Sequence, residues 1–124
     1  MAEAISAEYR AMAEEFVKRV TFRLGNKIDS ILLYGSVSRG EAKKSSDIDL
    51  FIVTPYAHNP VFKDAIYTIA TDFELENDFS FLISMFFITL KELAAQVLLK
   101  VPFIDNVKTD GVKLYGKWVF GETD

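Results

Sequence analysis

Two carboxylates and a glycine–serine turn are the residues of this chain best suited to chemistry. Gly35-Ser36 follows the apolar run at 31–34, and ten residues separate Ser36 from the pair Asp47 and Asp49. Gly35 has no Cβ, so the backbone can bend sharply and a ligand can approach closely, while Ser36 presents a hydroxyl. If residues 47–53 form a strand, its alternation points both carboxylates to one face.

The paired carboxylates predict a cation site. Two like charges side by side repel each other, and a cation held between them relieves that repulsion. Mg²⁺ fits best, because it prefers hard oxygen ligands and completes its octahedron with waters, one or two carboxylates and substrate phosphates. We therefore expect Asp47 and Asp49 to bind Mg²⁺ and to act in nucleotide transfer.

The turn and its surroundings predict a phosphate site. Free N–H groups at a helix start attract anions, and Arg39, Lys43 and Lys44 add positive charge nearby. We expect Gly35, Ser36, Arg39 and Lys43 to bind the triphosphate of a nucleotide. Each piece alone is common: the turn could be only a turn, and the acids only solvated residues. Their conjunction favours the functional interpretation.

These residues resemble a known signature. Gly35-Ser36, ten residues, then Asp47-Ile48-Asp49 resembles the nucleotidyltransferases of the DNA polymerase β superfamily. Within it, the chain is similar to the minimal nucleotidyltransferase (MNT) domains, small proteins often paired with HEPN-domain partners in prokaryotic toxin–antitoxin modules. The resemblance covers residues 31–53 and, more weakly, 102–115. It implies adenylyl transfer from ATP with Mg²⁺, and a HEPN-domain protein as partner.

The resemblance also implies a third carboxylate on a strand that follows the paired acids. The apolar run Phe79 to Ile88 predicts this strand, and Asp78, just before it, is the candidate third catalytic acid. Aligning the strand by its Ile83-Ser84 end instead puts Ser80 at that place. Asp78 has an equally plain structural interpretation as an acid in the turn before a strand.

The remaining elements are predicted by periodicity and turn residues. Apolar side chains recur every three or four residues from Ala2 to Leu24, which indicates an amphipathic helix. Asn59-Pro60 opens a second helix, Thr89 begins a third with a capping box, a short fourth covers about 103–109, and an edge strand follows Gly111. The fold class is α/β (α+β): a small mixed β-sheet flanked by helices, as in nucleotidyltransferases.

Composition bounds the function. The length of 124 residues predicts a single domain over 1–124, which the resemblance implies is a nucleotidyltransferase domain. Half of the residues are hydrophobic, none is cysteine, and the net charge is −4. The missing cysteines agree with a cytoplasmic setting. The acidic balance makes nucleic acid an unlikely partner, and no apolar run reaches the about 20 residues that span a bilayer.

Two functions remain open. The first is a Mg²⁺-dependent nucleotidyltransferase that moves AMP from ATP to a hydroxyl of a protein partner, the antitoxin of a HEPN/MNT pair. The second is a catalytically degenerate module that docks or neutralises its partner without chemistry, which Ser80 in place of the third acid would favour. The aromatic tail, Lys117 to Phe120, is either a partner anchor or a last piece of core.

Overall fold

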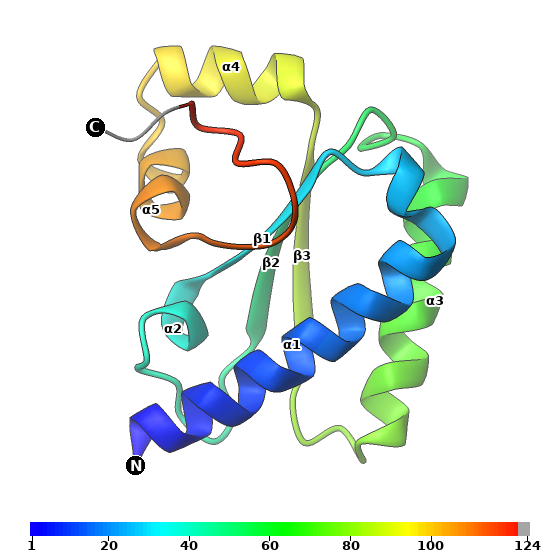
Figure 1. The fold of residues 1–124 in the computed structure, drawn as a ribbon, viewed down its shortest axis with the longest axis vertical. Coiled ribbons are helices and arrows are strands. Elements are labelled where there is room, and N and C mark those ends of the chain that lie inside the picture. Colours follow the sequence, from blue (N-terminus) through cyan, green and yellow to red (C-terminus); the bar gives the residue numbers. More distant parts are fainter. Residues whose placement is uncertain (122–124) are drawn as a thin grey trace.

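A computed structural model describes residues 1–121, which form a four-stranded mixed sheet with helices on both faces (Figure 1). The α/β fold class predicted from the sequence is confirmed. The elements are α1 (Ala2–Leu24), a short 3₁₀ turn (Gly25–Lys27), β1 (Ser30–Tyr34), α2 (Gly35–Ser38), β2 (Ile48–Val53), α3 (Pro60–Glu76), β3 (Ile83–Ile88), α4 (Leu90–Leu98), α5 (Pro102–Asp110) and β4 (Val112–Gly116).

The sheet has the strand order β3-β2-β1-β4. β1 pairs antiparallel with β2 and with β4, whereas β2 and β3 run parallel. The parallel pair needs a crossover, and α3 supplies it between the two strands. β1 and β2 are therefore central, and both strands that carry the candidate site lie in the middle of the sheet.

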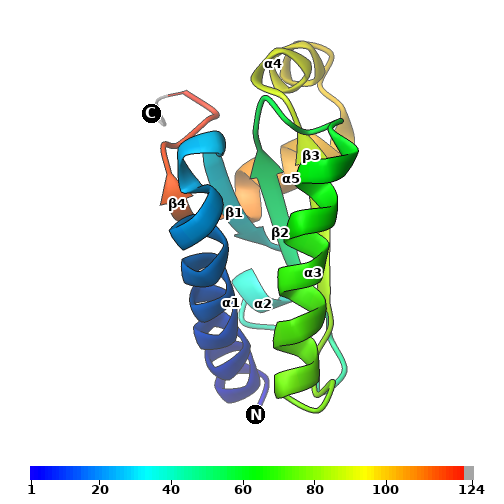
Figure 2. The ribbon, with the colours of Figure 1, turned by 90° about the vertical axis from the view of Figure 1, so that its right-hand side faces the viewer.

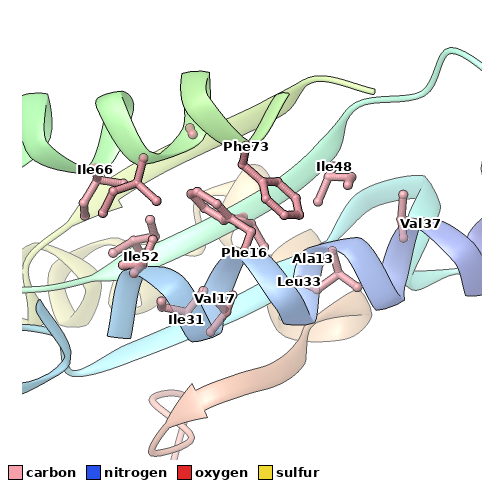
Figure 3. Packing of buried hydrophobic residues seen from close by; sticks show 14 of the residues in the cluster. Ala13, Phe16, Val17, Ile31, Leu33, Val37, Ile48, Ile52, Ile66 and Phe73 are labelled. Carbon is pink, nitrogen blue, oxygen red and sulfur yellow. The ribbon is translucent and has the colours of Figure 1, made fainter. Parts of the chain in front are cut away.

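Helices α1 and α3 lie side by side over one face of the sheet (Figure 2). Their apolar stripes meet the inward residues of β1 and β2 in the larger core cluster. Figure 3 shows Phe16 of α1 next to Phe73 of α3, between the side chains of Ile52 and Ile48. The two ring centroids are 5.9 Å apart. Asn59 caps α3 by accepting a hydrogen bond from the Phe62 N–H at 2.9 Å.

The opposite face of the sheet also carries packed helices. The sequence predicted this face only as the one that holds the site. Phe51, Val53 and Leu32 form a second core with α4 and α5. The unbroken apolar run at 50–53 is the signal for a strand buried on both faces. Beyond this second core, Asp49 of β2 is only half-buried, and Asp47 just before the strand is exposed.

The aromatic tail lies against this second core. Trp118, Val119 and Phe120 are partly buried there, and the Phe120 ring is 6.3 Å from that of Phe51. Of the two interpretations left open by the sequence, the structure has the tail as a piece of core rather than an exposed patch.

Two strand predictions need correction, while the helices agree closely. β3 begins at Ile83, not Phe79, because Asp78 and Phe79 both take a positive φ of 54° in the turn after α3. β2 begins at Ile48, so Asp47 directly precedes the strand. The predicted capping box of Thr89 and Glu92 is present at α4. No helix among residues 1–121 is long and apolar enough to cross a membrane.

Candidate active site

The glycine–serine turn touches the carboxylate of Asp49. Tyr34 ends β1 opposite Asp49 in the antiparallel pairing with β2, so the chain turns into α2 directly beside this carboxylate. Gly35 has a φ of +76°, and a Cβ built on it would overlap the Asp49 carboxylate. Glycine is therefore required here twice, for its backbone angle and for the missing side chain.

Asp49 is held in a way that disfavours its charge. It is half-buried, whereas Asp47 is exposed. Burial raises the pKa of Asp49 above its usual value, the neighbouring charge of Asp47 raises it further, and Arg39 lowers it. Two carboxylates that repel each other at the open end of a strand are a place where a cation would be stabilising.

Arg39 already has partners within the protein. Its guanidinium lies 2.8 Å from a carboxylate oxygen of Glu41 and 2.9 Å from one of Asp110, and the Ser38 hydroxyl donates to the Asp110 carbonyl. Arg39 thus braces the α2 turn against the end of α5, and its charge still reaches Asp49. Lys43, the other predicted phosphate contact, is exposed.

The loop that leads to Asp47 is fastened to the start of α1. The buried Tyr9 donates its hydroxyl to the carbonyls of Lys44, at 2.9 Å, and Ser80, at 3.1 Å. The Ser6 hydroxyl accepts a hydrogen bond from the Ala42 N–H at 2.9 Å. One helix therefore fixes both the loop before Asp47 and the turn before β3.

The turn, the loop and the paired carboxylates fall within a match to a known family. The family model described as the nucleotidyltransferase domain matches residues 13–107. The chain belongs to this nucleotidyltransferase family. The resemblance drawn from residues 31–53 is confirmed at that level, and the chain is a nucleotidyltransferase by family.

The chain is also similar to known proteins in sequence or in fold. A Methanocaldococcus jannaschii protein assigned as a protein adenylyltransferase is 29% identical over 101 residues, which cover 82% of this chain and 93% of that protein. A toxin–antitoxin structure with AMP-PNP has a TM-score of 0.53 at 22% identity, over 84% of this chain and 73% of the other. A Sulfolobus solfataricus structure assigned as a nucleotidyltransferase has a TM-score of 0.56 at 21% identity, over 94% and 89%. The two structures are similar to this one in fold.

The donor set of this nucleotidyltransferase fits Mg²⁺ that arrives with phosphates. Asp47 and Asp49 offer hard carboxylate oxygens, and the repulsion that raises the pKa of Asp49 would be relieved by a bound cation. Within residues 1–121, no group of three or more His, Cys, Asp or Glu side chains is placed to hold a metal ion. The two aspartates would need substrate oxygens and waters to complete an octahedron.

The two candidates for the third acid lie outside the strand. Asp78 is exposed in the turn that precedes β3, and Ser80 is also exposed there, with its carbonyl bonded to Tyr9. In the parallel register of β2 and β3, the residue beside Asp49 is Ser84. Sequence alone did not indicate Ser84, because the register depends on the position of the turn.

Tyr34 is a further site residue that sequence reasoning missed. Burial and the nearby charge of Asp49 raise the pKa of its phenol to about 12, so the hydroxyl stays protonated at neutral pH. Its ring packs edge-on against Phe51 and Phe103. Tyr34 is therefore part of the second core and, at the same time, the cross-strand partner of Asp49. Only its place at the end of a strand, just before the glycine, could have indicated this position.

Proposed function

We propose that this chain transfers AMP from Mg²⁺-ATP to a hydroxyl group of a protein partner. The observation that carries the proposal is the contact between the Gly35 turn and the Asp49 carboxylate. It puts the turn that would bind phosphate beside the carboxylate that would bind the metal, which is the arrangement that a metal–triphosphate needs. The family match and the relative assigned as a protein adenylyltransferase support the same reaction class.

In this reaction the acceptor oxygen attacks the α-phosphorus of ATP. The new oxygen–phosphorus bond forms as the bond from the α-phosphorus to the bridging oxygen breaks, pyrophosphate leaves, and the hydroxyl proton passes to solvent. Bound Mg²⁺ would neutralise charge on the triphosphate and the leaving pyrophosphate. Asp47 and Asp49 would hold the metal, and the N–H groups of the turn at Gly35 and Ser36 would orient the phosphates.

Lysine and arginine side chains would add to this arrangement in different ways. Arg39 is fixed by Glu41 and Asp110, so it supplies positive charge near Asp49 without leaving its brace. Lys43 is exposed and free to swing toward a bound phosphate. A point charge on a flexible stem suits that task.

The proposed acceptor protein is a HEPN-domain toxin, for which this chain would be the antitoxin. The resemblance to MNT domains implies such a partner, and a toxin–antitoxin complex with AMP-PNP is among the solved structures of similar fold. The apolar and aromatic side chains of the tail are already packed against the second core. The partner would therefore meet the open site around Asp47 rather than the tail.

Intact-mass measurement of the partner tests this function. The chain is mixed with a candidate HEPN-domain partner, and each Mg²⁺-NTP is added in turn. We expect the partner to gain the mass of adenylyl groups with ATP only, and to gain none with the Asp47→Asn, Asp49→Asn double variant. An unchanged partner mass with every nucleotide would overturn the transferase proposal.

A second candidate is a module that binds its partner without chemistry. The placement of Ser84, rather than an acid, beside Asp49 favours it. On this alternative the complex forms, the toxin is neutralised, and the double Asn variant neutralises it equally well. That last result separates the two candidates, because a transferase would lose its effect with the aspartates.

A further inference from the structure

Ser84 occupies the place next to Asp49 on the face that holds the site. β2 and β3 run parallel with Asp49 paired to Ser84 and Phe51 paired to Phe86. The Phe51 and Phe86 rings stack at 5.6 Å and 12°, which shows that paired residues of these strands point to the same face. Alternation along each strand then puts Asp49 and Ser84 on that face as well.

Ser84 is also open to a ligand. It is exposed and lies on β3, a strand at the edge of the sheet. The side chain at position 84 therefore faces the same space as the Asp49 carboxylate. A serine offers that space a neutral hydroxyl, whereas an aspartate would offer a third charged oxygen ligand.

The affinity of a hard cation depends on how many charged oxygens surround it. Two carboxylates, one of them exposed, leave most of the coordination shell to water and substrate. An ion held this way gains its remaining anionic ligands from phosphates. The number of carboxylates on this face therefore decides whether metal binds alone or only with nucleotide.

We propose that Ser84 keeps this site at two carboxylates, so that the chain takes up its divalent ion only together with the phosphates of a nucleotide. The inference rests on the proposed function and deepens it, by making nucleotide the ligand that completes the metal site. Asp78 then has no part in metal binding, because it lies in the turn before β3 rather than beside Asp49.

The test measures Mn²⁺ binding to the metal-free protein. Electron paramagnetic resonance monitors this binding with and without ATP. We expect the wild type to bind Mn²⁺ weakly alone. Ser84→Asp should bind Mn²⁺ without nucleotide at least about tenfold more tightly, because it adds a third carboxylate. Ser84→Asn introduces a side chain of the same size as aspartate but without its charge, and this variant should bind Mn²⁺ as the wild type does. Ser84→Glu repeats the test if the Asp variant folds poorly.

Two further variants test whether position 84, rather than 78 or 80, is the one beside the metal site. Asp78→Asn should leave Mn²⁺ binding unchanged, and Ser80→Asp should not tighten it, since both residues lie before the strand. Ser84→Asp and Ser84→Glu binding no more tightly than Ser84→Asn would overturn the proposal. So would an Asp78→Asn variant that loses Mn²⁺, because Asp78 would then be the third ligand.

These readouts do not depend on turnover. Tighter Mn²⁺ binding by the Asp variant supports the two-carboxylate site even if no partner is ever adenylylated, in which case only the proposed function fails. Conversely, a wild type that binds Mn²⁺ tightly without ATP and adenylylates its partner would retain the function and refute the role given to Ser84.

Discussion

Gly35 faces the carboxylate of Asp49 so closely that a methyl group on the glycine would overlap it. Gly40, five residues on, has nearly the same backbone angle, with φ of +74° against +76°. A Cβ on Gly40, however, would meet nothing within 4 Å. The two glycines therefore separate the cost of a left-handed backbone from the need for open space at the site.

Replacing each glycine by alanine tests that distinction. Both variants should lose roughly 1–2 kcal/mol of stability, because alanine resists a left-handed conformation. Gly35→Ala should also weaken Mg²⁺-ATP binding at least about tenfold, since its methyl group displaces Asp49. Isothermal titration calorimetry gives the affinities and urea unfolding gives the stabilities. Equal affinities in the two variants would make Gly35 a purely structural residue.

Asp49→Asn should stabilise the metal-free protein at pH 7. The folded protein raises the pKa of Asp49 above its usual value of 3.8, so ionised Asp49 costs stability at neutral pH. That cost is fully present above the raised pKa and disappears as the pH falls below the usual value. Because Asp49 is half exposed and solvent screens the effect, we expect a gain of roughly 0.5–1 kcal/mol.

Thermal melts in EDTA measure this gain for Asp49→Asn and for Asp47→Asn. The Asp47 variant should gain less, because it removes only the repulsion and not the buried charge. The advantage of Asp49→Asn should shrink toward pH 4. A lower melting temperature for Asp49→Asn at pH 7 would mean that the ionised carboxylate makes a stabilising contact.

Local patterns were enough to predict the helices and the central part of the site. The bounds of α1, Ala2–Leu24, follow from its apolar period and the Gly25 that stops it. Gly35 and Asp49 lie only 14 residues apart in sequence, and the antiparallel pairing of β1 with β2 brings the two residues together.

Long-range register was beyond the sequence. Nothing in the amino-acid sequence indicates that Asp78 and Phe79 adopt a positive φ. Their turn nevertheless moves the start of β3 and so puts Ser84 beside Asp49. The brace from Arg39 to Asp110 spans 71 residues, and the bond from Tyr9 to Ser80 also spans 71. Such contacts follow from packing rather than from local propensity.

Arg39→Gln should raise the pKa of Asp49. Arg39 is the neighbouring charge that lowers this pKa, so its removal leaves burial and Asp47 unopposed. Carbon-13 NMR titration of the carboxyl groups in the metal-free protein follows the change directly. Lys43→Gln is the control and should leave the Asp49 titration where it is. An unmoved titration in Arg39→Gln would show that the residue only braces α2 against α5.

Tyr9→Phe should loosen the loop before Asp47. The change keeps the ring that packs on Phe81 but removes the hydroxyl that binds two carbonyls. We expect a stability loss of roughly 1–2 kcal/mol. Hydrogen exchange should accelerate at 41–47, and Mg²⁺-ATP binding should weaken severalfold. Tyr67→Phe, at an exposed tyrosine of α3, should change none of these quantities. If hydrogen exchange at 41–47 is as slow in Tyr9→Phe as in the wild type, Tyr9 does not position this loop.

Trp118→Ala with Phe120→Ala should destabilise the protein rather than only weaken partner binding. The two rings lie 5.3 Å apart, and Phe120 stacks near Phe51 in the second core. Because both side chains are only partly buried, we expect a loss of roughly 1–3 kcal/mol for the pair, less than full burial would give. Phe22→Ala is the matched control, since Phe22 is 90% exposed and should cost almost nothing. Urea unfolding separates these values. If the double variant unfolds like the wild type but no longer holds its partner, the tail is an interface anchor, and the partner must displace it from the second core.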